Sequence, residues 1–140
     1  MMNVELIFVP VLAHIMLIFM VYIYLGVVKS RAVKEGSVDR KLAALNTKAW
    51  PEDVVKVSNN LANQFESPII FYVLSIIYFI TDNVSGVIIV LMSLYVLSRY
   101  IHAYIHVTTN YVPNRYKFFL IGVLTLLGLS IWLILRIVGI

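Results

Sequence analysis

Four long apolar stretches constrain the fold of this chain more than any other feature of its sequence. They run from about residue 4 to 28, 55 to 80, 84 to 108 and 114 to 138. An α-helix rises about 1.5 Å per residue, so each stretch can cross a hydrocarbon layer about 30 Å thick. The stretches are continuous and lack the period-two alternation of a membrane β-strand. The sequence therefore predicts an all-α integral membrane protein, a bundle of four transmembrane helices.

The composition agrees with a multi-pass membrane protein that forms a single domain over residues 1–140. Hydrophobic residues make up 61% of the chain and charged residues only 13%, half the share of about 25% in soluble domains. Only the connection over residues 29–56 is long, so we expect no separate soluble domain. The net charge of +4 comes from Lys and Arg in particular loops, and we therefore expect no nucleic-acid partner.

Positive charge is unevenly distributed among the three connections. Lys and Arg exceed Asp and Glu in residues 29–56, residues 81–84 contain neither Lys nor Arg, and the third connection is followed by Arg115 and Lys117. The positive-inside rule then predicts that loops one and three are cytoplasmic and that both termini are outside. Pro51, Glu52 and Asp53 are typical of a helix start, which indicates that the second span begins in the cytoplasm.

Polar residues enter the second apolar stretch with helical spacing. Asn59, Asn63 and Glu66 are spaced i, i+4 and i+7, which predicts that they share one face of a helix that kinks near Pro68. Polar groups within a membrane are costly unless they meet partners, and they are candidates for functional sites. His14, in the first stretch, is expected to face the interior of the bundle in a structural role.

A second polar stripe lies near the same end of the third stretch. Arg99, His102 and His106 follow at i, i+3 and i+7. Because the second and third spans are antiparallel, both stripes should lie at a similar depth, with Arg99 as the cationic partner of Glu66. Arg115, with Tyr116 beside it, begins the fourth stretch at this end.

Three interpretations of this arrangement remain open. The first is a buried network in which Glu66, Arg99 and the asparagines neutralise one another and fix helix register. The second is a metal site of His102, His106 and Glu66, for which an i, i+4 pair of histidines is a weak indication. The third is a site for an anionic ligand with Arg115 as its key charge, although Arg115 could instead only anchor the helix end.

These motifs resemble those of the MAPEG family, the membrane-associated proteins in eicosanoid and glutathione metabolism. Asn63-Gln-Phe-Glu66 followed by Pro68 is similar to the family's Asn-x-x-Glu block. Arg99-x-x-His102, then a proline-containing turn and Arg115, is similar to its second block. The resemblance covers nearly the whole chain, and the form of the first block is most similar to that of bacterial members, so we expect a bacterial inner-membrane protein that resembles microsomal glutathione transferase.

The resemblance implies a homotrimer that binds glutathione between neighbouring subunits near the cytoplasmic face. Arg115 would stabilise the glutathione thiolate, and Asn63 and Glu66 would contact the peptide. Further candidate glutathione-binding residues around the same rim are Asn59, Arg99, His102, His106 and Tyr116. The chain has no Cys, so a thiol must come from a ligand.

Two positions depart from the family pattern. Asn59 stands where glutathione-using members usually have Arg, and His106 stands where they often have Tyr. Lys29, Arg31 or Lys56 are candidates to replace the lost charge. The predicted function is a glutathione-dependent membrane transferase or peroxidase for lipophilic electrophiles or lipid hydroperoxides. The alternative is a non-catalytic membrane protein of the same fold that binds a lipid or a partner helix.

Overall fold

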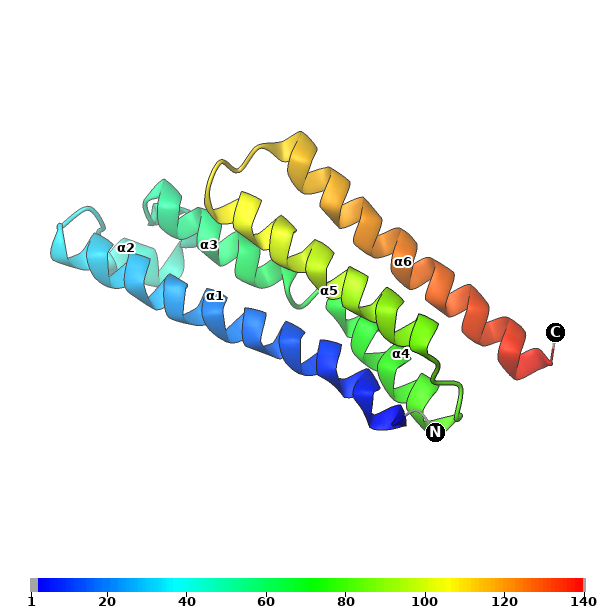
Figure 1. The fold of residues 1–140 in the computed structure, drawn as a ribbon. Coiled ribbons are helices and arrows are strands. Elements are labelled where there is room, and N and C mark those ends of the chain that lie inside the picture. The colour runs from blue at the N-terminus through cyan, green and yellow to red at the C-terminus, as the bar shows by residue number, and fades with distance from the viewer. Residues whose placement is uncertain (1–2, 140) are drawn as a thin grey trace.

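The computed structural model describes residues 3–139, and the regular structure of this part of the chain is entirely helical (Figure 1). The elements are η1 (Val4–Ile7), α1 (Phe8–Lys34), α2 (Arg40–Leu45), η2 (Thr47–Ala49), α3 (Glu52–Asn63), α4 (Pro68–Ile80), α5 (Gly86–Val107) and α6 (Val112–Val138). Four helical segments are long and apolar enough to cross a membrane, namely Val4–Lys34, Glu52–Ile80, Gly86–Val107 and Val112–Val138. The prediction of an all-α fold with four such helices is confirmed.

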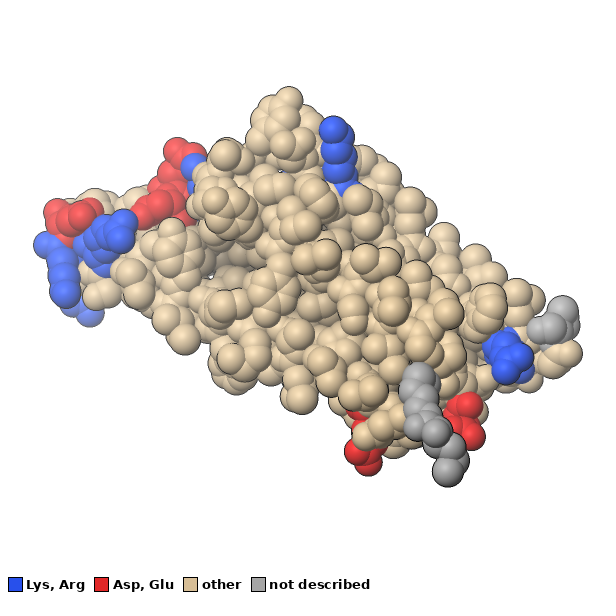
Figure 2. Space-filling view, in the orientation of Figure 1, with Lys and Arg blue, Asp and Glu red and all other residues tan. Residues whose placement is uncertain are grey.

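The outer surface carries the apolar side chains that a soluble protein would bury. Ile23, Ile80 and Val87 are 69%, 70% and 65% exposed, and similar residues cover the outside of every long helix. On the face shown in Figure 2, most charged side chains lie toward the two ends of the molecule and one Lys or Arg side chain stands on the upper edge, with a broad uncharged area between them. An apolar surface of this extent is suited to contact with lipid.

Helix α1 is longer than its apolar stretch and continues to Lys34, six residues past the predicted limit at residue 28. The additional turns of α1 are stabilised because Val28 and Ala32 pack against Val54 and Val57 of α3 in a buried cluster. Gly36 follows the C-cap Glu35, and its φ of +65° is a conformation that suits glycine. The Gly36 and Ser37 backbone N–H groups donate to carbonyls of the last turn, as in a Schellman motif.

The second span is interrupted within the predicted apolar stretch. Helix α3 ends at Asn63, residues 64–67 are not α-helical, and α4 begins at Pro68, the residue at which the sequence predicts a kink. Proline suits the first turn of a helix because its missing N–H is not needed there. The prediction that Asn59, Asn63 and Glu66 share one helix face is therefore wrong, since Glu66 lies in the interruption.

Helix α5 lies among the other long helices and contacts α1, α3 and α6 (Figure 1). It contributes Met92 and Tyr95 to one apolar cluster, which also contains buried residues of η1, α4 and α6, and Ala103 to the second cluster. Helix α6 approaches closely at Gly122, where an added Cβ would lie 3.0 Å from Ser98 Oγ and 3.3 Å from Tyr95 Cε2. Between the two clusters α5 presents Arg99 and His102, and this polar layer contains the candidate site.

Candidate functional site

A hollow of about 250 Å³ lies where the α3–α4 interruption, α5 and the first turns of α6 meet. We call it the Arg115 hollow. It is lined by Asn63, Glu66, His102, Val112, Arg115, Tyr116 and Phe119. Five of the residues predicted from the sequence, Asn63, Glu66, His102, Arg115 and Tyr116, therefore lie around one cavity.

Arg115 is positioned by the turn between α5 and α6. Asn110 takes a left-handed backbone conformation with a φ of +50°, which asparagine tolerates better than most residues. Its N–H donates to the Ile105 carbonyl over 2.8 Å, and its side-chain Oδ1 accepts from Arg115 Nη1 over 2.5 Å. Arg115 Nε is buried and has no hydrogen-bond partner among residues 3–139. Asn110 thus holds one side of the guanidinium and leaves another donor free.

His102 connects α5 to the first turns of α6. Its Nδ1 lies 3.0 Å from the Arg115 carbonyl oxygen. Because a carbonyl can only accept, Nδ1 must carry the proton in this bond. In the neutral ring Nε2 is then an acceptor, and this atom is buried without a partner within the described part of the chain. The hollow is therefore lined by a fixed imidazole as well as a fixed guanidinium.

Arg99 does not line the hollow and instead binds the C-terminal end of α3. Its side chain is 1% exposed, and Nη2 donates to the Asn63 carbonyl over 2.8 Å and to Gln64 Oε1 over 3.4 Å. A helix C-terminus exposes carbonyls without intrahelical partners and carries partial negative charge. Arg99 donates to one of these carbonyls, and its positive charge opposes the partial negative charge of the helix end, which helps α3 to end inside the bundle.

The predicted ion pair between Glu66 and Arg99 is absent from the described residues, where only Lys56 and Glu52 form an ion pair, at 2.8 Å. The prediction assumes a continuous helix that would point Glu66 at Arg99. The interruption after Asn63 instead leaves Glu66 exposed and offers Arg99 a backbone carbonyl. The interpretation of Arg99 as part of a structural network is supported, but its main acceptor is the backbone.

Sequence analysis missed two buried amides beside Arg99. Gln64 is 0% and Asn60 1% exposed, and Gln64 Nε2 donates to Asn60 Oδ1 over 3.0 Å and to the Asn60 carbonyl over 3.2 Å. Their i, i+4 spacing is the same as that of Asn59 and Asn63, so spacing alone could not show which pair is buried.

Three other predicted positions lie apart from the hollow's lining. Asn59 is exposed, and His106 is 2% exposed with its ring centroid 5.8 Å from that of His102. Among residues 3–139 no three His, Cys, Asp or Glu side chains converge, so the metal interpretation finds no third ligand. His14 is fully buried, as predicted, and its Nδ1 lies 2.6 Å from the Tyr72 hydroxyl.

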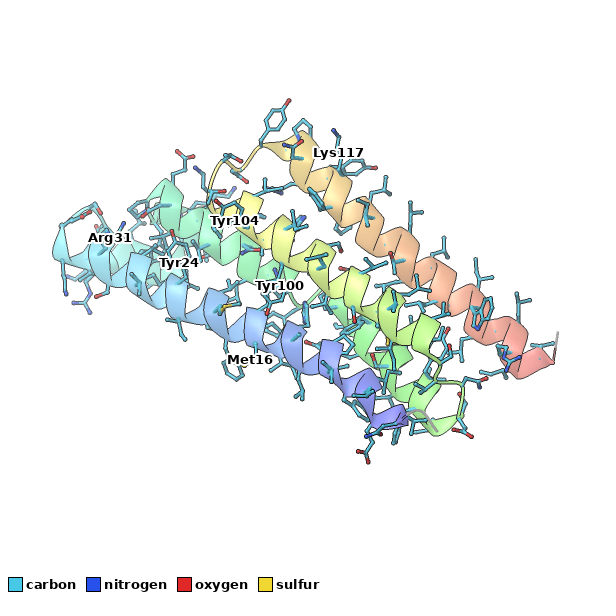
Figure 3. All side chains as sticks on the ribbon, in the orientation of Figure 1. Met16, Tyr24, Arg31, Tyr100, Tyr104 and Lys117 are labelled. Carbon is cyan, nitrogen blue, oxygen red and sulfur yellow. The ribbon has the colours of Figure 1, made fainter. Side chains whose placement is uncertain are left out.

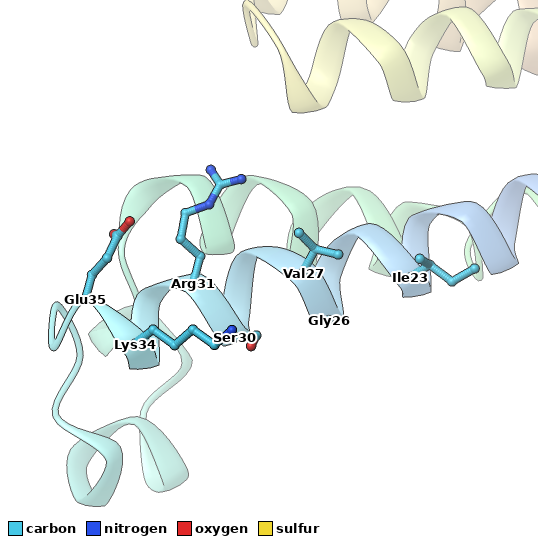
Figure 4. Close-up of a pocket in the computed structure, with 7 residues that line it drawn as sticks. All are labelled: Ile23, Gly26, Val27, Ser30, Arg31, Lys34 and Glu35. Carbon is cyan, nitrogen blue, oxygen red and sulfur yellow. The ribbon is translucent and has the colours of Figure 1, made fainter.

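The cations considered as replacements for the missing family Arg also lie elsewhere. Lys56 pairs with Glu52, and Lys29 lies over the Trp50 ring at 5.0 Å from its centroid. Arg31 lines a different, open hollow of about 630 Å³ on the outer face of α1, with Ile23, Gly26, Val27, Ser30, Lys34 and Glu35 (Figure 4). That second hollow, the Arg31 hollow, is lined by residues of α1 and its C-terminal end.

Comparison with known proteins agrees with this architecture. The family model of the MAPEG family matches residues 7–135, which is nearly the whole chain. No curated protein and no solved structure matches the chain. A family match of this extent, on a fold with four helices able to span a bilayer, shows an integral multi-pass membrane protein, and the chain belongs to the MAPEG family.

Proposed function

We propose that this protein is a glutathione-dependent membrane transferase or peroxidase that acts on lipophilic electrophiles or lipid hydroperoxides. The observation that carries the proposal is the Arg115 hollow, where Arg115, His102, Asn63 and Glu66 line one cavity. Membership of the MAPEG family supports glutathione-related or eicosanoid-related chemistry.

Arg115 is the residue that stabilises the thiolate. Glutathione supplies the thiolate as the nucleophile, and a guanidinium, which stays charged at neutral pH, favours the ionised thiol. Its buried Nε has no partner among the described residues, so this guanidinium has a donor to spare. Asn110 holds the group in place through Nη1, which reduces the ordering needed when the ligand binds.

The remaining polar groups of the hollow suit the peptide part of glutathione. Glu66 is exposed and free of Arg99, so its carboxylate is available for the ammonium group. His102 Nε2, which has no partner among the described residues, can accept a hydrogen bond, and the Asn63 amide can both donate and accept. Among the described residues of one subunit, however, Arg115 is the only Lys or Arg that lines the hollow, whereas glutathione has two carboxylates as well as the thiol.

A homotrimer supplies the missing charge in this proposal. The Arg31 hollow is lined from the side of α1 alone, so a neighbouring subunit could complete it (Figure 4). We propose that Arg31 of one subunit faces the Arg115 hollow of the next and replaces the family Arg at the Asn59 position. Lower glutathione affinity in Arg31→Ala, with little change in Lys29→Ala and Lys56→Ala, would support this arrangement. Cross-linking in detergent that stops at dimers would contradict the trimer.

The membrane orientation is also a proposal. Loops one and three lie at the opposite end of the bundle from the two termini (Figure 1). Together with the Lys and Arg of loop one, this supports cytoplasmic loops one and three, with the termini outside, in a bacterial inner membrane.

Thermal unfolding of the purified protein in detergent, with and without millimolar glutathione, tests binding. A ligand that binds only the folded state raises the Tm with the logarithm of its concentration. We expect a rise for the wild type and a much smaller one for Glu66→Ala. Lys117→Ala is the matched control, because Lys117 is exposed and outside the hollow's lining.

The alternative is a non-catalytic protein that binds a lipid or a partner helix. It is favoured by Asn59, an exposed amide where glutathione-using members usually carry Arg. No thermal shift with glutathione in the wild type would favour this alternative over the enzyme.

A further inference from the structure

A third cavity, distinct from the Arg31 hollow, lies on a different side of α5 from the Arg115 hollow. It is a groove of about 210 Å³ between α1 and α5, with α3 behind it, and its lining is mainly apolar. We call it the α1–α5 groove. Leu17 and Met20 line it from α1 and Ala103 from α5, and Tyr24, Tyr100 and Tyr104 lie along the seam between the two helices (Figure 3).

One polar group in this groove is buried and unsatisfied. Asn60 lines the groove and is 1% exposed, and its Nδ2 has no hydrogen-bond partner among residues 3–139. The Tyr100 hydroxyl, by contrast, donates to the Ala13 carbonyl over 2.8 Å. An unpaired amide donor in an apolar cavity is unfavourable, so the groove is suited to a ligand that supplies an acceptor.

The contact with Arg99 determines which side-chain atom of Asn60 has no hydrogen-bond partner. An arginine can only donate, so its contact at 3.4 Å requires the oxygen of Gln64. Gln64 Nε2 is then the donor to Asn60 Oδ1, and neither amide can be flipped without losing a bond. The free atom of Asn60 is therefore the NH2 group, a donor.

We propose that the α1–α5 groove binds one acyl chain of a bilayer phospholipid, with its ester carbonyl accepting a hydrogen bond from Asn60 Nδ2. The apolar lining matches an acyl chain, and the carbonyl supplies the acceptor that Asn60 lacks. Tyr24 and Tyr104 are exposed beside the groove, and tyrosine is enriched at the membrane interface, where phospholipid ester groups lie. This proposal does not depend on glutathione chemistry.

The buried donor of Asn60 favours a lipid chain over a second copy of the protein. An apolar helix face that covered the groove of about 210 Å³ would leave Asn60 Nδ2 without an acceptor, because the backbone carbonyls of a helix are bonded within the helix. A phospholipid ester carbonyl is not bonded in this way, and a small movement of the Asn60 side chain would bring its donor to the groove.

Native mass spectrometry of delipidated protein tests the hydrogen bond. The protein is offered equal amounts of dioleoyl phosphatidylcholine, which has ester carbonyls, and its diether analogue, which has none. We expect the wild type to retain the diester lipid about 2- to 10-fold better, as one hydrogen bond predicts. The preference should disappear in Asn60→Leu, which removes the donor and keeps a side chain of similar size.

Asn59→Leu is the matched control, because Asn59 is the adjacent asparagine on α3 but is exposed and does not line the groove. It should keep the preference for the diester lipid. Equal retention of both lipids by the wild type, or an unchanged preference in Asn60→Leu, would overturn the proposal.

A second measurement distinguishes a lipid from a covering subunit. In a background with Trp50→Phe and Trp132→Phe, Met20→Trp places a single indole in the groove. Vesicles of phosphatidylcholine brominated on its acyl chains then quench that indole only if lipid reaches it. We expect the indole of the Met20→Trp variant to be quenched as strongly as that of Ile134→Trp, since Ile134 on α6 is 59% exposed and lines neither of the two hollows nor the groove. Protection of the indole in Met20→Trp alone would show that protein fills the groove and would overturn the lipid assignment.

Discussion

The two arginines of the polar layer have different surroundings. These surroundings support a structural role for Arg99 and a ligand-binding role for Arg115. Arg99 is buried and donates to the end of α3, whereas Arg115 is partly exposed, lines the hollow and has an Nε without a partner among residues 3–139. Both lie in motifs that resemble the family's, so the sequence alone groups them together. Their hydrogen-bond partners assign Arg99 to the structure of the bundle and support Arg115 as the residue that meets the ligand.

Replacing Arg99 should destabilise the protein far more than replacing Glu66. Arg99→Met leaves the Asn63 carbonyl and Gln64 Oε1 without their donor, and a buried unsatisfied group is unfavourable by about 1–3 kcal/mol. Glu66→Met changes an exposed side chain and should alter the free energy of unfolding by less than about 0.5 kcal/mol. Reversible unfolding in mixed detergent measures both variants. If both single variants lost the same free energy of unfolding and the double variant lost no more than either, Glu66 and Arg99 would form an ion pair after all.

At the scale of the helices, the interruption of the second span decides which residues meet. Hydropathy predicts the four long helices because each must bury a continuous apolar stretch in lipid. It does not predict a helix that ends at Asn63, because that ending depends on Arg99, which lies far along the chain on α5. The sequence therefore predicts the depth of Asn63, Glu66, His102 and Arg115, and the hollow agrees with it.

The contact of Arg99 with the end of α3 also explains why the sequence could not show which amide side chains are buried. Asn59, Asn60, Asn63 and Gln64 offer two overlapping i, i+4 pairs, and only packing against Arg99 selects Asn60 and Gln64 as the buried pair. Asn110 is recognisable in the sequence as part of a turn, but its bond to Arg115 depends on a left-handed backbone that spacing does not reveal.

The contact between α5 and α6 should be sensitive to side-chain size at Gly122. Gly122→Leu places a Cβ 3.0 Å from Ser98 Oγ, and overpacking typically destabilises by about 1–3 kcal/mol. Gly128→Leu is the matched control on the same helix, because nothing lies within 4 Å of its added Cβ. Unfolding in detergent compares the two. A Gly122→Leu variant as stable as Gly128→Leu would show that α6 does not pack closely on α5.

For the whole molecule, the absence of Cys allows the orientation to be mapped directly. Lys41→Cys in loop one and Thr109→Cys in loop three should react from the same side with a membrane-impermeant maleimide. Thr81→Cys, between α4 and α5, should react only from the other side. In intact bacterial cells we expect labelling of the Thr81 variant alone, and labelling of the loop-one and loop-three variants instead would reverse the proposed orientation.

The central proposal is that Arg115 stabilises the thiolate of glutathione bound by this protein. The most direct test is the ultraviolet difference spectrum of the purified protein with glutathione at neutral pH, recorded for the wild type, Arg115→Ala and the control Lys117→Ala. We predict thiolate absorbance in the wild type and in Lys117→Ala and its loss in Arg115→Ala. No thiolate absorbance in the wild type, or undiminished absorbance in Arg115→Ala, would contradict the proposal.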